Sequence, residues 1–236
     1  MRALALLATT ALVAGLVAAA VALGQAGGSQ QTLEVTVKPN KAGTKKHPRN
    51  VVLNIVTKVV TLSGQPKPTI AKAVLDFPNG SLYNGGKFPH CSQTTLDSRG
   101  PSACPKGSKI GSGLVDAFAG TIEAKPTVTA FNGPGKNHVE LFLATDVPVI
   151  IRQTIPGTLT RGSGPYALKL TLPIPDALQT VVGLPVNLVS FQTRIKKTGL
   201  IQAASCPKSH KWPFDITTFT TDGQQLHGST TVTCKR

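Results

Sequence analysis

Residues 33–38, Leu-Glu-Val-Thr-Val-Lys, alternate strictly between apolar and polar side chains. A period of two places successive side chains on opposite faces of a strand, so this stretch predicts a strand with one buried face. Similar alternation returns at 71–77, 139–143, 168–172 and 189–195, with Val189, Phe191 and Ile195 on one predicted face of the last run. Near the C-terminus the pattern places Val232 and Cys234 together, which predicts that Cys234 points inward.

Residues that form turns separate these runs, among them Asn79-Gly80, the stretch 132–135 and Asp222-Gly223. Asn-Gly and Asp-Gly pairs favour the tight turns that join antiparallel strands. We therefore expect an all-β fold, an antiparallel β-sandwich of immunoglobulin-like or jelly-roll-like form, built as a single domain over residues 32–236. Two smaller sandwiches that meet near 147–164 are the alternative. The stretch 175–182 has the pattern of a short helix.

The N-terminal segment has a different character from the rest of the chain. Arg2 is followed by an almost uninterrupted apolar run to Leu23, and small residues follow. This arrangement is typical of an export signal, which we assign to residues 1–26 with cleavage near Ala26, followed by a flexible hinge at 27–31. An apolar run of about 20 residues is also long enough for an uncleaved anchor. We expect no transmembrane span after processing and a secreted or surface-associated protein.

The chain has four cysteines, Cys91, Cys104, Cys206 and Cys234, all within the predicted exported part. An even number of cysteines in an oxidising compartment predicts two disulfides, and four cysteines allow three pairings. There is no Cys-x-x-Cys and no paired histidine spacing of the kind that zinc sites use. We therefore expect no metal and no cofactor.

Two stretches of the sequence resemble a known group of proteins. The first contains Cys91-Ser92, Leu96, Gly100-Pro101, Ala103-Cys104-Pro105, Gly107-Ser108, Ile110-Gly111 and Gly113, and the second contains Cys206-Pro207, Trp212, Phe214, Thr221-Asp222-Gly223 and Cys234. Both are similar to regions of uncharacterised secreted β-rich proteins of high-GC Gram-positive bacteria, a resemblance that covers residues 77–236. It implies export, β structure and the two disulfides, and it supplies no catalytic residues.

No catalytic motif stands out in the sequence. The ten acidic residues are spread singly, and the five histidines, His47, His90, His138, His210 and His227, sit among turn residues. A hydrolase would need a nucleophile, a histidine and an acid in contact, which sequence alone cannot establish. We therefore expect a protein that is not an enzyme, and an envelope hydrolase with a site assembled from distant residues is the alternative.

The charge is the most informative functional feature of the sequence. The net charge is +15 and the pI is about 10.0. The predicted polyanion-binding residues are Lys41, Lys45, Lys46, Arg49, Arg194, Lys196 and Lys197. A strongly basic exported protein attracts anionic partners, here an anionic cell-wall polymer or a lipid headgroup. Nucleic acid is not expected, because export removes that target and aromatic residues make up only 5% of the chain.

These observations predict an exported, non-enzymatic binding or structural module that contacts anionic components of the cell envelope. The positive charge and the predicted strands are also compatible with two alternatives to this binding role. Dispersed lysines keep a β protein soluble and protect its edge strands from aggregation. A subunit of a surface assembly could pair with a neighbour through such an edge strand.

Overall fold

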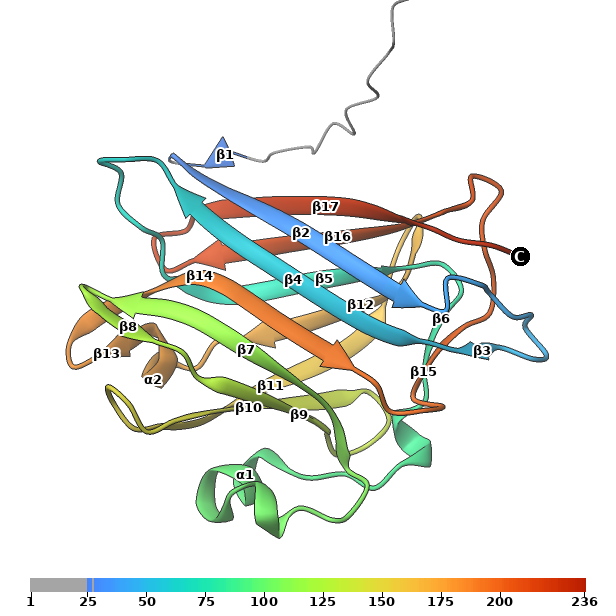
Figure 1. The fold of residues 1–236 in the computed structure, drawn as a ribbon, viewed down its shortest axis with the longest axis horizontal. Helices are drawn as coiled ribbons and strands as arrows, with labels where there is room; N and C mark the ends of the chain where they lie inside the picture. The colour runs from blue at the N-terminus through green and yellow to red at the C-terminus, as the bar shows by residue number, and fades with distance from the viewer. Residues whose placement is uncertain (1–24, 27) are drawn as a thin grey trace, which may run out of the picture.

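The computed structural model describes residues 25–26 and 28–236 (Figure 1). The predicted signal peptide therefore lies almost wholly outside the described residues, and its cleavage point stays a prediction. Within the described residues, no helix is long and apolar enough to cross a membrane.

Strands dominate the described chain. They are β1 (Gln25–Ala26), β2 (Ser29–Lys38), β3 (Arg49–Asn50), β4 (Val52–Thr61), β5 (Ile70–Pro78), β6 (Ser81–Tyr83), β7 (Lys109–Ala119), β8 (Ile122–Ala124), β9 (Thr127–Asn132), β10 (His138–Thr145), β11 (Ile151–Arg161), β12 (Tyr166–Pro173), β13 (Thr180–Val181), β14 (Leu184–Ile195), β15 (Ile201–Ala203), β16 (Lys211–Thr220) and β17 (Gln225–Thr233). The helices are α1 (Gln93–Arg99) and α2 (Asp176–Gln179), with 3₁₀ turns at Gly85–Lys87 and Pro101–Ala103.

Most strands belong to one 14-stranded sheet in the order β1-β2-β4-β14-β7-β9-β10-β11-β12-β5-β16-β17, with β13 and β8 attached to β14 and β7. A small second sheet has the order β3-β15-β6. Every ladder between these strands is antiparallel. The large sheet curls into a sandwich whose two layers are continuous with each other (Figure 1). The predicted all-β antiparallel class and the single domain are confirmed.

The inward faces of the curled sheet form the core. Leu33, Leu53, Phe77, Trp212 and Phe214 belong to one buried cluster, and a second cluster lies between β7, β9, β10 and β11. Cys234 is buried, as the alternation predicted. The prediction that Val189 faces the core is wrong, because the pairing register of β14 shifts between Leu188 and Ser190. This bulge makes Leu188, and not Val189, pack against the second cluster.

The last strand of the sheet, β17, and β2, which has only the two-residue β1 beyond it, come together through side chains rather than through a ladder. Gln31 is 0% exposed, its amide nitrogen donates to the Thr57 hydroxyl on β4 at 3.0 Å, and its amide oxygen accepts from the Thr218 hydroxyl on β16 at 3.0 Å. At Gly228 of β17, an added Cβ would lie 3.1 Å from the backbone oxygen of Gln31. Glycine there allows β2 to approach closely enough for Gln31 to reach across.

The structure corrects two expectations about organisation. Residues 29–31 were predicted to belong to a flexible hinge, which is wrong, because they begin β2 and both Ser29 and Gln31 are buried. The alternative of two sandwiches divided near 147–164 is also wrong, since β11 pairs with β10 and β12 in the same sheet. The predicted short helix at 175–182 is confirmed in part by α2.

We expect Gln31→Leu to lower the free energy of unfolding by about 2 kcal/mol, because it leaves the buried Thr218 hydroxyl without its acceptor. Gln30→Leu is the matched control, since this neighbouring glutamine is only half-buried. Urea unfolding of both variants measures the difference. Equal stability of the two variants would show that the Gln31 bridge does not hold the ends of the sheet together.

Candidate functional site

The strand register gives the curled sheet two ends with different chemistry. Ile195 of β14 pairs with Leu53 and Gly111, whereas Val186, near the other end of β14, pairs with Ala119. The end near Ile195 collects segments 38–51, 78–92, 101–109, 132–138, 161–166, 194–211 and 233–236, here called the basic end. The opposite end collects segments 119–126, 146–151 and 174–186, here called the apolar end.

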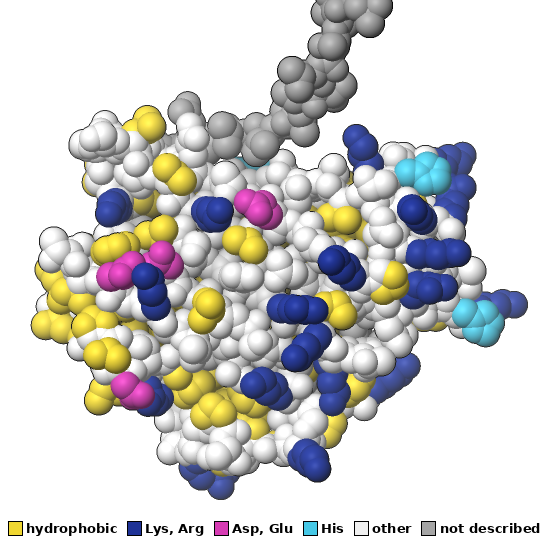
Figure 2. Space-filling view, in the orientation of Figure 1, with side chains coloured by type: hydrophobic (Ala, Val, Ile, Leu, Met, Phe, Trp, Pro, Cys, Tyr) yellow, Lys and Arg dark blue, Asp and Glu magenta, His cyan; other side chains and the backbone are white. Residues whose placement is uncertain are grey.

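The basic end holds most of the chain's 25 lysines and arginines and none of its ten acidic residues. All seven predicted polyanion-binding residues lie there: Lys41, Lys45, Lys46, Arg49, Arg194, Lys196 and Lys197. Dark blue side chains accordingly gather at the side of the molecule that carries β3 and β15 (Figure 2). Among the described residues, none of the four ion pairs uses a cation of this end. Within the described residues these cations therefore have no acidic partner, and most are exposed, whereas Lys197 is half-buried with its Nζ 5.5 Å from the centre of the Phe88 ring.

Two disulfides brace the basic end, Cys91–Cys104 and Cys206–Cys234. The second joins the segment after β15 to the C-terminus, where Lys41 forms a β-bridge with Lys235. Trp212 is buried beside this disulfide and donates from Nε1 to the Ser205 carbonyl oxygen at 2.9 Å. The predicted disulfides are confirmed, in the sequential pairing, and they are typical of a protein that folds in an oxidising compartment.

A cavity of about 210 Å³ lies inside the curled sheet. Its walls are mainly aliphatic and aromatic side chains, most of them from β4, β5, β7, β10, β11, β12 and β14. Among the described residues, the lining contains no Ser, His, Asp, Glu, Lys or Arg side chain. Its polar groups belong to Tyr83, Thr57, Thr193 and Thr218. Periodicity predicted inward faces on β5, β10, β12 and β14, but the space between the strands could not be predicted because they come from distant parts of the sequence.

A buried carboxylate lies on the outer face of the sheet, under the segment that the Cys91–Cys104 disulfide closes. Glu140 of β10 is 4% exposed, and its Oε2 atom has no hydrogen-bond partner among the described residues. Asp97 of α1 accepts a hydrogen bond from the Thr154 backbone nitrogen at 3.0 Å nearby. Burial, reinforced by the charge of Asp97, raises the pKa of Glu140 to about 7. Nothing in the sequence pattern distinguished Glu140 from a solvated acid.

The hydrolase alternative finds little support in the geometry of the described residues. His227 and Asp215 form a pair at 2.7 Å on the β16–β17 hairpin, but no serine hydroxyl hydrogen-bonds to His227. The cavity brings no histidine or acid toward its interior. Across the described residues, no group of three or more His, Cys, Asp or Glu side chains is arranged to hold a metal ion.

No protein-family model, curated protein or solved structure matches this chain. The resemblance to secreted proteins of high-GC Gram-positive bacteria therefore stays a prediction. Function has to be inferred from the basic end and from the cavity.

The raised pKa of Glu140 predicts a specific pH dependence of stability. The pKa in the folded state is about 7 and the ordinary value is 4.5, so folding favours the protonated acid. The stabilisation of the folded state by protonated Glu140 is fully present below pH 4.5 and is lost as the pH rises through 7. We expect Glu140→Gln, which mimics the protonated acid, to raise the free energy of unfolding by about 2 kcal/mol at pH 8 and to change it little at pH 4.

Urea unfolding between pH 4 and pH 8 measures this effect. Glu34→Gln is the matched control, because Glu34 lies exposed on β2. Parallel pH profiles for Glu140→Gln and the unmodified protein would contradict the assignment.

Proposed function

We propose that this chain is an exported, non-enzymatic binding module whose basic end contacts an anionic polymer or lipid headgroup of the cell envelope. The observation that carries this proposal is the separation of charge: the segments of the basic end concentrate the cations and contain no acidic residue, and the helix α1 between two of them adds only Asp97. Charges of one sign on one surface attract polyanions over distances of about 10 Å at moderate salt. Lysines that served only to keep the protein soluble would not need to gather at one end of the sheet.

The arrangement of the basic end also suits a repeating anionic ligand. Lys45, Lys46 and Arg49 are exposed on the connection between β2 and β4, whereas Arg194 and Lys196 lie exposed at the end of β14. Backbone hydrogen bonds fix these segments, from Gly43 to the Ala203 oxygen and from Lys196 to the Ile110 oxygen. Cations held in place on several connected segments can contact successive charges of one polymer at a smaller cost in entropy.

The alternative of a surface assembly built by strand pairing has less support. β2 and β17 approach each other closely where Gly228 meets the backbone of Gln31, so the closure partly covers the edges that a neighbouring subunit would use.

We expect the triple variant Lys45→Gln, Lys46→Gln and Arg49→Gln to weaken binding to poly(glycerol phosphate) at low salt by about tenfold, because it removes three unpaired cations from one segment. Co-sedimentation with the immobilised polymer across a salt series measures the effect. Binding of the unmodified protein should fall as salt rises. Vesicles of phosphatidylglycerol and phosphatidylcholine, tested in parallel, distinguish a lipid headgroup from a wall polymer.

The matched control replaces Lys58, Lys72 and Lys169 with glutamine, which removes the same charge from strands away from the basic end. The proposal requires this control to bind more tightly than the first triple variant. Equal weakening by both variants would mean that net charge alone governs association. Absence of binding at low salt would contradict the proposed function.

A further inference from the structure

The cavity inside the sheet is a second feature that the proposed function does not use. We propose that it binds a single uncharged hydrocarbon chain, such as the alkyl or isoprenoid chain of a lipid, which enters at the apolar end. The volume of about 210 Å³ exceeds the roughly 150 Å³ of an engineered apolar cavity that stays dry and binds benzene. A cavity of this size and lining is suited to hydrocarbon rather than to water.

The lining indicates the polarity of the ligand. The hydroxyls of Thr57 and Thr218 both bond to Gln31, and the Tyr83 hydroxyl donates to the Asn132 side-chain oxygen at 2.7 Å. Thr193 supplies the remaining hydroxyl of the lining. Three of the four polar groups are thus already engaged within the protein, and a ligand would be held by apolar contact.

The shape of the lining favours a chain over a compact ring system. Residues that line the cavity follow β14 along most of its length, from Val186 to Ile195, and they include Ile110 and Ala119 near the two ends of β7. A cavity of about 210 Å³ that extends over this length is narrow. A flexible chain fills such a space with few voids.

The apolar end exposes large side chains where the lining reaches it. Val147 and Ile150 are 75% and 77% exposed on either side of the lining residue Val149. Val182 is 79% exposed beside Val181, which also lines the cavity. Figure 2 shows yellow side chains crowded at the side that carries β8 and β13. Exposed apolar side chains that cluster together mark a contact surface for an apolar partner.

Val182 is the strongest sign that these exposed side chains have a role. It forms the β13–β14 turn with Gly183, and both residues have positive φ, 52° and 76°. A two-residue turn of this kind favours Asn-Gly, and a β-branched residue is unfavourable in the left-handed region. Valine at this position therefore destabilises the turn and also exposes an apolar side chain to water. Such a residue is expected where an apolar contact is needed.

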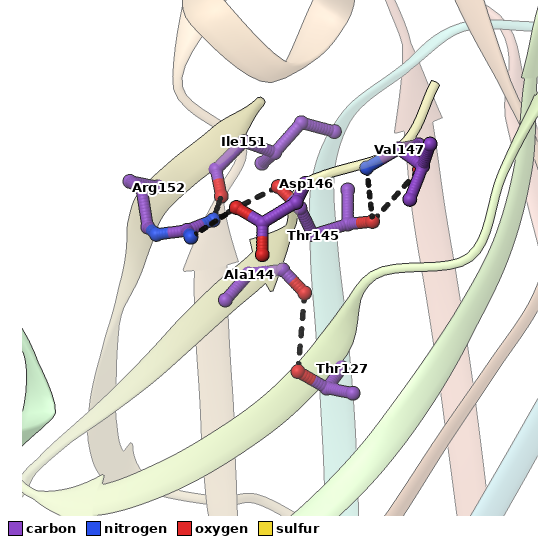
Figure 3. Close-up of polar contacts among 7 residues, drawn as sticks. All are labelled: Thr127, Ala144, Thr145, Asp146, Val147, Ile151 and Arg152. Atoms are coloured by element: carbon purple, nitrogen blue, oxygen red, sulfur yellow. Dashed lines mark hydrogen bonds and ion pairs between the residues drawn. The ribbon is translucent and has the colours of Figure 1, made fainter. Parts of the chain in front are cut away.

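The loop between β10 and β11 presents its apolar residues from a fixed base (Figure 3). The Arg152 guanidinium donates to the Asp146 carboxylate and to the backbone oxygens of Thr145 and Ile151. The Thr145 hydroxyl donates to the Val147 carbonyl oxygen at 2.8 Å. These bonds hold both ends of the loop while Val147 and Ile150 face solvent.

Four charges near the entrance are paired with one another, whereas Asp176 of α2 forms no ion pair within the described residues. Arg152 pairs with Asp146, and Lys125 pairs with Glu123 at 2.9 Å. A charged headgroup would have to compete with these pairs, so the entrance favours an uncharged one. This inference goes beyond the proposed function and depends on the opposite end of the molecule.

The test is titration of the purified protein with the methyl ester of cis-parinaric acid, an uncharged, chain-shaped polyene fluorophore that brightens in apolar surroundings. We expect saturable binding of one fluorophore per protein. Straight-chain alcohols from octanol to hexadecanol should displace it, with an affinity gain of about fourfold per methylene until the cavity is full. Absence of binding, or displacement that never levels off with chain length, would overturn the proposal.

Variants locate the binding inside the sheet. Ala117→Leu adds three carbon atoms to the lining and should weaken fluorophore binding by about tenfold. Ala167→Leu adds the same atoms at a half-buried position outside the lining and should bind as the unmodified protein does. Thermal unfolding confirms that both variants fold. If Ala117→Leu does not fold, Val186→Phe replaces it. Equal affinity of the folded lining variant and the control would place the fluorophore elsewhere and overturn the proposal.

A second measurement tests entry at the apolar end. Val182→Asn restores the favoured Asn-Gly turn and should raise the melting temperature, yet it should slow fluorophore uptake from phosphatidylcholine vesicles severalfold. Leu114→Asn, at another exposed apolar residue, is the control. Equal uptake rates for both variants would overturn entry at this end. The Lys45, Lys46 and Arg49 variant should take up the fluorophore normally, so the two proposals can fail separately.

Discussion

The buried amide of Gln31 is the contact on which the rest of the structure depends. The large sheet has two end strands, and no ladder of backbone hydrogen bonds joins them. Gln31 of β2 instead bridges β4 and β16, by hydrogen bonds to Thr57 and Thr218, and Gly228 of β17 lets the backbone of β2 approach at the same point. Without this closure the inward faces of the strands would open to water. The core and the cavity both follow from it.

Closure of the sheet leaves two ends with separate chemistry. Long connections at one end carry the cations, and the two disulfides hold those connections in place. At the other end, the apolar loops surround the region where the cavity lining reaches the surface. The two proposed ligands, an anionic polymer and a hydrocarbon chain, would therefore contact opposite ends of the molecule and would not compete.

The sequence predicted what depends on local pattern. Alternation around Leu33 identified inward faces, and the cysteine count indicated two disulfides. The cation clusters were recognised one by one, but their meeting at one end depends on register between strands such as β4, β14 and β7. Gln31, Glu140 and the cavity could not be predicted, because each is defined by neighbours far away in the chain. Gln31 was even assigned to a hinge, since a polar stretch that begins a buried strand has the composition of a linker.

The most direct test of an enclosed hydrocarbon site is a crystal of the protein soaked with 1-bromodecane and measured at the bromine absorption edge. An anomalous peak inside the curled sheet, among the lining residues of β7, β10, β12 and β14, is the result that this account predicts. Bromine peaks confined to the outer surface, or no peak in crystals shown to have taken up the compound, would contradict it.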